Sequence, residues 1–156
     1  MPPRGWSWAG LSMRILFTLA GAAGLIISAF LNWIENVDGV NLEVESLWRP
    51  GVFNRPQSGE FWETVGFAML VLGLLAIIGL APRSGWLTRL AGALGLVGFV
   101  LFVIQVYRTR EPFDISDLQL GAWLALAGSV VALIGGFLGT RARYVMPPAP
   151  AVIQEP

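Results

Sequence analysis

The stretch "ILFTLAGAAGLIISAFLNWI", residues 15–34, decides the fold. It contains no charged residue, and it has the length of about 20 residues that a helix needs to cross ~30 Å of hydrocarbon. Of the whole chain, 55% is hydrophobic and only 13% is charged, whereas a soluble domain is about one quarter charged. The sequence therefore predicts a membrane protein whose first span is this stretch.

Three more apolar runs follow, and none has Asp, Glu, Lys or Arg in its middle. They cover residues 61–80, 86–107 and 119–139. We therefore expect an all-α membrane protein, a four-helix transmembrane bundle that forms one domain over residues 1–140. Outer loops are expected at residues 35–60 and 108–118. Residues 141–156 are rich in proline, which is typical of a disordered tail.

The arginines indicate how the spans are oriented. Four spans place both termini and the connection after the second span on one side of the membrane. That side holds Arg4, Arg14, Arg83, Arg89, Arg141 and Arg143, whereas the other side holds the remaining four arginines and every acid except Glu155. Basic residues in short loops favour the cytoplasmic side. We expect a multi-pass protein of the inner or plasma membrane with both termini and the tail in the cytoplasm.

A short repeat predicts how the helices pack. "LAGAAGL" at residues 19–25 returns as "LAGALGL" at residues 90–96, which indicates a duplicated helical hairpin with the two halves related by a two-fold axis along the membrane normal. Small residues mark the faces where helices touch in lipid. The predicted packing residues are Gly24, Gly95, Gly121, Gly128 and Gly135. A glycine-lined pore or ligand groove is the alternative interpretation of the same residues.

Several function classes find no support in the sequence. The chain has neither cysteine nor histidine, so thiolate chemistry, a haem axial histidine and most zinc sites are excluded. It has no nucleophile–base pair, phosphate-binding loop or spaced metal ligands, and we expect no enzyme, cofactor or metal site. Zero net charge argues against nucleic-acid binding. Only Asn32 and Gln105 offer polar groups near the outer ends of the spans that could serve transport.

The first outer loop carries the signal of a β-hairpin. Asp38–Gly39 is a strong two-residue turn signal, because both residue types tolerate the positive φ of a type I′ turn. A turn there would pair Val37 with Val40 and would place the apolar residues on one face. This face would comprise Trp33, Val37, Val40, Leu42 and Val44. The second outer loop is expected to cover it through Phe113 and Ile115.

The sharpest candidates for an exposed binding surface follow the hairpin. They are Trp48, Arg49 and Phe53, with Phe113 from the second outer loop. Trp48 has no span to anchor, so it is either the hydrophobic plug of the outer loop or a contact for a partner or lipid. By contrast Trp33, Trp62, Trp86 and Trp123 lie near span ends, where a belt of indoles is expected. Ser116 and Gln119 have the spacing of a capping box for the last helix.

Three stretches together resemble a family. "AFLNW" ends the first span, "DGV" follows in the loop, and "GAWLALAGSVVALIGGFL" forms the last span. They resemble uncharacterised small four-span membrane proteins of high-GC bacteria, whose first helix often ends Phe-Leu-Pro-Trp; Asn32 replaces that proline. The layout is also similar to the claudin and tetraspan family. There Trp33, Leu47 and Trp48 would match the first-loop motif, with Ser46 in place of its glycine and without the paired cysteines.

The sequence therefore favours a non-enzymatic membrane protein that acts by association with other proteins. It would be an accessory or scaffold subunit of a membrane complex, or would associate with itself, through the structured outer loop. The alternative is a small oligomeric transporter or channel with Asn32 and Gln105 as polar gates.

Overall fold

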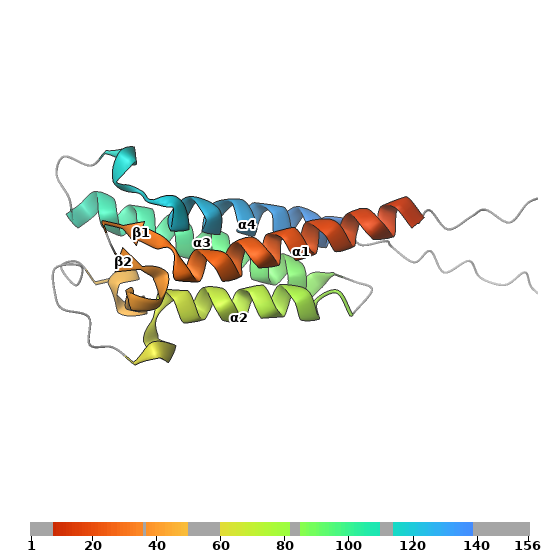
Figure 1. Ribbon diagram of the computed structural model, residues 1–156, viewed down its shortest axis with the longest axis horizontal. Helices are drawn as coiled ribbons and strands as arrows, with labels where there is room; N and C mark the ends of the chain where they lie inside the picture. The colour runs from red at the N-terminus through yellow and green to blue at the C-terminus, as the bar shows by residue number, and fades with distance from the viewer. Residues whose placement is uncertain (1–7, 36, 50–59, 82–84, 110–113, 139–156) are drawn as a thin grey trace, which may run out of the picture.

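The computed structural model describes residues 8–35, 37–49, 60–81, 85–109 and 114–138. Four helices run side by side within them (Figure 1): α1 (Trp8–Phe30), α2 (Val65–Ile78), α3 (Trp86–Thr109) and α4 (Leu120–Phe137). Ser12–Phe30 of α1 and the whole of α3 and α4 have the length and apolar composition to cross a membrane. α2 is apolar but has only 14 residues. The predicted helical architecture is thus confirmed as three long apolar helices and one shorter helix.

Several helix boundaries differ from the predicted span limits; α1, for example, begins at Trp8 rather than at residue 15, and two of the differences have a clear local cause. α1 ends at Phe30 because the next residues leave the helix as a β-strand. Before α2, Phe61–Glu63 form the 3₁₀ helix η4, and α2 begins only after Thr64. The Thr64 hydroxyl accepts a hydrogen bond from the Phe67 N–H (3.2 Å) and caps the helix. The prediction from hydropathy alone included η4 in the second span.

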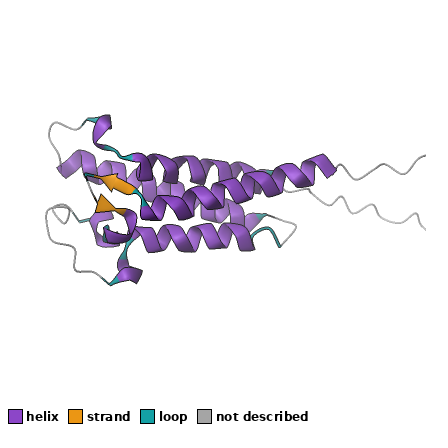
Figure 2. Ribbon diagram, viewed as in Figure 1, coloured by secondary structure: helices purple, strands orange, loops and turns teal. Residues whose placement is uncertain are grey.

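The helices form a ring in which each has two main neighbours. α1 packs against α4 and α2, and α3 packs against the same two helices. α1 ends, and α4 begins, at the end of the bundle that carries the β-hairpin (Figure 2). We call this the hairpin end, and we call the opposite end, where α2 connects to α3, the turn end.

The predicted hairpin exists, but its predicted turn is wrong. β1 (Asn32–Ile34) pairs antiparallel with β2 (Val37–Asp38), with Ile34 opposite Val37. The turn therefore lies before Val37 rather than at Asp38–Gly39. Asp38 is extended, with φ −78°, and Gly39 opens the 3₁₀ helix η1 (Gly39–Asn41). A Cβ on Gly39 would lie 2.8 Å from the carbonyl oxygen of Ala29, so glycine here permits a close approach to α1 instead of a tight turn.

Backbone hydrogen bonds and bridges attach the hairpin to both neighbouring connections. The Gln119 N–H donates to the Trp33 carbonyl (3.0 Å), and Ile34 forms a β-bridge with Leu118. The Val65 N–H donates to the Leu42 carbonyl (2.7 Å). The hairpin is consequently fixed to the starts of α2 and α4.

Two expectations about the second outer connection are wrong. Leu118 is buried against the hairpin, whereas Ile115 is 63% exposed and does not cover it; Phe113 lies outside the described residues. The capping box belongs to the 3₁₀ helix η5 (Ile115–Asp117) and is formed by Asp114 and Asp117. Gln119 precedes α4 without a side-chain capping bond.

Trp33 forms the centre of the core at the hairpin end. It does not belong to the belt of indoles that was expected at the span ends. It is fully buried, its Nε1–H donates to the Ser28 carbonyl (2.7 Å), and its ring meets Phe102 edge-on at 5.0 Å. Leu42 is also fully buried. The other three apolar residues of the predicted hairpin face, Val37, Val40 and Val44, pack against this core as predicted.

Candidate functional site

Trp48 projects from an ordered turn at the hairpin end. The turn is the 3₁₀ helix η2 (Val44–Leu47), and the Glu45 carbonyl accepts hydrogen bonds from the N–H groups of both Trp48 (3.2 Å) and Arg49 (3.0 Å). The backbone is therefore fixed, yet the Trp48 side chain is 60% exposed. The interpretation of Trp48 as the hydrophobic plug of the loop is wrong, because Trp33 and Leu42 fill that core.

The remainder of η2 anchors this turn to the bundle. Ser46 is fully buried, and its hydroxyl donates to the Glu43 carbonyl. Val44 and Leu47 pack against the core, and η2 lies on α3. Trp48 is thus presented by a segment with one face buried and the other open.

Arg49 lies beside Trp48 and pairs with the acid one turn earlier. Its Nη1 is 2.6 Å from Glu45 Oε1, and both side chains are largely exposed. An exposed pair of this kind contributes less than about 1 kcal/mol to stability. The pair ties the Arg49 guanidinium to the η2 turn. The other two predicted binding residues, Phe53 and Phe113, lie outside the described residues.

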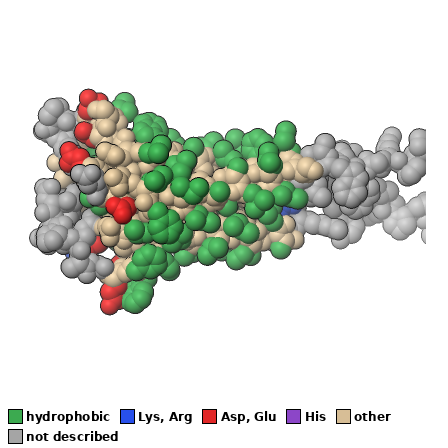
Figure 3. Space-filling model, viewed as in Figure 1, with side chains coloured by type: hydrophobic (Ala, Val, Ile, Leu, Met, Phe, Trp, Pro, Cys, Tyr) green, Lys and Arg blue, Asp and Glu red, His purple; other side chains and the backbone are tan. Residues whose placement is uncertain are grey.

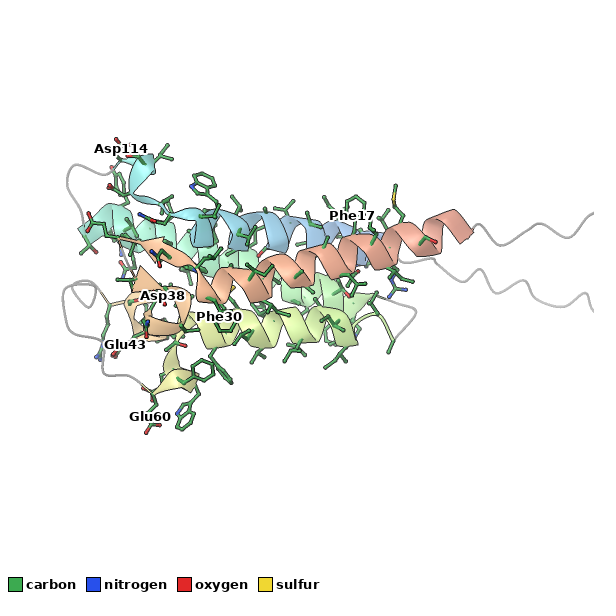
Figure 4. The ribbon with its side chains drawn as sticks, viewed as in Figure 1. Phe17, Phe30, Asp38, Glu43, Glu60 and Asp114 are labelled. Carbon is green, nitrogen blue, oxygen red and sulfur yellow. The ribbon has the colours of Figure 1, made fainter. Side chains whose placement is uncertain are left out.

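Carboxylates gather at the hairpin end, as the space-filling view shows (Figure 3). The side-chain view places Asp38, Glu43, Glu60 and Asp114 at the hairpin end (Figure 4). Hydrophobic side chains cover the length of the helices instead. The described residues contain no group of three acids placed to hold a metal ion.

Of the five glycines predicted to pack helices, Gly24 and Gly128 lie where the backbones of α1 and α4 touch. A Cβ on Gly24 would lie 2.9 Å from the Cα of Gly128, and a Cβ on Gly128 would lie 2.8 Å from the backbone nitrogen of Leu25. Gly135 approaches α1 in the same way at Thr18, whereas Gly121 meets the carbonyl oxygens of Leu31 and Asn32 just beyond the end of α1. Every buried residue of α4 is Gly, Ala or Ser. Small side chains let the two backbones touch, which is how helices pack in lipid.

Contacts of the two repeat copies do not follow a two-fold axis. In the first copy Gly21 and Gly24 face α4, which an exact two-fold would convert into contacts of the second copy with α2. Instead Gly92 and Gly95 also face α4, at Leu133 and Ser129. Both copies therefore clasp the same helix. Atoms of the neighbouring helices occupy the space beside these glycines, so the glycines do not line an open groove.

Two arginines at the turn end cap helices, a role that the sequence interpretation missed. Arg14 is buried two turns inside α1, and its Nη2 donates to the Gly79 carbonyl (3.1 Å) at the end of α2. Arg89 Nε donates to the Gly136 carbonyl (2.8 Å) near the end of α4, and its guanidinium lies 4.6 Å from the Phe137 ring centroid. A cation at a helix C-terminus is favourable. Each arginine thereby joins two neighbouring helices.

The two polar gate candidates occupy different environments. Asn32 is half-buried in β1. Gln105 on α3 is 2% exposed, and within the described part of the chain neither atom of its side-chain amide has a hydrogen-bond partner. A buried amide without partners costs about 1–3 kcal/mol.

Replacing Gln105 with Leu should therefore raise the free energy of unfolding by about 1–2 kcal/mol, because the desolvated amide is removed. Thermal unfolding in a mild detergent measures the change. Gln119→Leu is the matched control, because Gln119 is exposed and makes no side-chain capping bond; it should leave stability unchanged. Loss of stability in Gln105→Leu would show that the amide is hydrogen-bonded in the folded protein.

Comparisons with protein-family models, with curated proteins and with solved structures find no match to this chain.

Proposed function

We propose that this protein is a non-enzymatic four-helix membrane protein that works by association, as an accessory or scaffold subunit of a membrane complex. The observation that carries the proposal is the exposed Trp48 on the ordered η2 turn. Tryptophan and arginine are enriched among the residues that dominate binding energy at protein interfaces. Trp48 and Arg49 present both types side by side.

The proposed arrangement has all four helices crossing the membrane and the hairpin end outside the cell. The excess of arginines in the sequence that flanks the turn end, six against four, supports this orientation. The acidic side chains at the hairpin end agree with it. Both termini and the tail at residues 141–156 would then be cytoplasmic. The association surface would face the extracytoplasmic side, where Trp48 is open to a partner.

Rigidity of the turn strengthens the case. The backbone of a mobile loop must be ordered upon binding, which costs about 1–2 kcal/mol per residue. The Trp48 backbone is already held by the Glu45 carbonyl, and η2 is anchored through buried Ser46. Binding at this surface would therefore pay little of that cost.

Trp48→Ser should weaken the native complex at least ten-fold, because removing an interface tryptophan commonly costs 2 kcal/mol or more. The measurement is the mass of the particle extracted gently from its source membrane, by native mass spectrometry, together with the amount of partner retained. Trp86→Ser is the matched control, since Trp86 is similarly exposed but lies at the turn end. An unchanged particle in Trp48→Ser would refute the proposal.

A second candidate function is a small oligomeric transporter or channel. The observation that favours it is the buried amide of Gln105, a polar group inside an apolar helix. Solute flux through the protein in liposomes, abolished by Gln105→Leu while the fold is retained, would select this function over the first.

A further inference from the structure

Helices α2 and α3 match in height at the turn end and in their middle. The Thr88 hydroxyl donates to the Ala76 carbonyl (3.2 Å), and a Cβ on Gly79 would lie 2.7 Å from the Thr88 nitrogen. Farther along, a Cβ on Gly98 would lie 3.2 Å from Met69 Cε. Ten residues separate Gly79 from Met69, and ten separate Thr88 from Gly98. The two antiparallel helices thus stay level with each other along the bundle axis from the turn end to their middle.

They do not match at the hairpin end. From the level of Gly98, α3 continues to Tyr107 and beyond, whereas α2 reaches only Val65. At a rise of 1.5 Å per residue these distances are about 13 Å and about 6 Å. Figure 1 shows α3 extending past the start of α2. The outward-facing side of α3 stays apolar up to Tyr107, at Ile104 and Tyr107, and the exposed Arg108 follows.

Acidic residues fix where hydrocarbon can end beside α2. Glu60 and Glu63 are exposed directly before the helix. A charged side chain in hydrocarbon costs about 3 kcal/mol, so the polar region of the membrane must reach the start of α2. The 14 residues of α2 span about 21 Å, well under the ~30 Å of a typical hydrocarbon core.

Two aromatic side chains lie at this level, and we call them the aromatic ledge: Phe61 and Trp62 of η4, which are 49% and 62% exposed. The Phe61 ring meets the Phe67 ring edge-on at 5.4 Å, which attaches the ledge to α2. In Figure 1, η4 projects sideways from the bundle. Exposed aromatic rings between carboxylates and an apolar helix suit the headgroup region, where tryptophan is enriched.

We propose that the bilayer is locally thinner beside α2, by about 7 Å relative to its thickness beside α3, and that the aromatic ledge lies in the headgroup region at this thin side. Thinning costs fractions of a kcal/mol per ångström of mismatch, which sums to a few kcal/mol over about 7 Å. Submerging both Glu60 and Glu63 would cost about 6 kcal/mol. The occupant of this face is lipid: the outward residues of α2 are the aliphatic Val71, Leu74 and Ile78.

The chain has no cysteine, so single cysteines can carry a nitroxide label. Three variants place the label next to the aromatic ledge (Glu63→Cys), at the far end of α3 (Tyr107→Cys) and in the middle of α2 (Leu74→Cys). Accessibility to oxygen and to a water-soluble nickel complex, measured by EPR in dioleoylphosphatidylcholine vesicles, gives the depth of each label. The labels at 63 and 107 should both lie at the headgroup boundary, although their axial heights differ, and the label at 74 should lie deep.

Three results would overturn the proposal. A label at 107 in bulk water would mean a flat membrane at the ledge level. A label at 63 deep in hydrocarbon would mean that the ledge is submerged. An immobile label at 63, accessible to neither reagent, would mean that protein covers this face. Glu60→Cys and Ile104→Cys repeat both measurements at neighbouring exposed positions, so a variant that fails to insert does not decide the outcome.

Discussion

Replacing Gly128 with Ala should lower the free energy of unfolding by about 2 kcal/mol, a large loss for adding a single methyl group. The new Cβ would lie 2.8 Å from the Leu25 nitrogen and 3.0 Å from the Gly21 carbonyl oxygen. These are backbone atoms of α1, which can yield only if α1 and α4 move apart. Overpacking of this kind typically costs 1–3 kcal/mol, and here it also outweighs the higher helix propensity of Ala.

Gly98→Ala is the matched control, because the sign of its effect should be opposite. A Cβ on Gly98 would meet only the flexible end of Met69, at 3.2 Å. The gain in helix propensity, up to about 1 kcal/mol, should then leave the protein equally or more stable. Unfolding followed by circular dichroism in mixed detergent compares the two variants. Equal effects would mean that the α1–α4 contact does not limit stability.

The contact between α1 and α4 illustrates what the sequence could predict. Small residues repeated at helical spacing are placed by the physics of packing in lipid, and that physics depends little on the rest of the fold. Gly24 and Gly128 could therefore be selected before the structure was known. Which helix each glycine meets depends on the arrangement of the bundle, and the repeat alone suggested a symmetry that Gly92 and Gly95 do not obey.

The hairpin shows why a local signal can be right in kind and wrong in position. The sequence correctly indicated a hairpin after the first helix, but the alternating residues 40–45 that were expected to form its second strand lie mostly in η1 and η2. The Asp38–Gly39 pair was assigned to the turn because glycine permits positive φ. In the structure, Gly39 is selected by its contact with the Ala29 carbonyl, and no pattern within the loop reports that contact. A glycine can be required because a neighbouring backbone leaves no room for a Cβ or because its φ is positive. The two cases cannot be distinguished until the position of the neighbouring helix is known.

The start of α2 could have been predicted more closely. Glu63 and Thr64 stand at the beginning of the predicted second span, and threonine is a preferred N-cap. Giving the cap more weight than hydropathy would have started the helix at Val65 and assigned Phe61 and Trp62 to the preceding connection. The exposure of Trp48 and the burial of Gln105, in contrast, depend on tertiary packing. The sequence could select Trp48 as a candidate, but it could not decide between the exposed and the buried interpretation of that side chain.

Trp33→Ala should be the most disruptive single change at the hairpin end. Truncating a fully buried tryptophan typically costs 3–5 kcal/mol, and this one also donates its Nε1–H to the Ser28 carbonyl and packs edge-on against Phe102. The Trp33 backbone and side chain join α1, α3 and the start of α4. We expect the connections at the hairpin end to detach from the bundle before the helices separate.

Limited proteolysis at the hairpin end and thermal unfolding measured on the same sample separate these two steps. Trp33→Ala should become cleavable between α1 and α2 at temperatures where the helical signal is still intact. Trp33→Phe keeps most of the buried ring area but loses the hydrogen bond, so its effect should be intermediate. Trp62→Ala is the matched control, because Trp62 is exposed and fills no core; its hairpin end should stay resistant. If Trp33→Ala lost helical signal and protease resistance together, the hairpin end and the bundle would form one cooperative unit, and the Trp48 surface would then be as stable as the helices that support it.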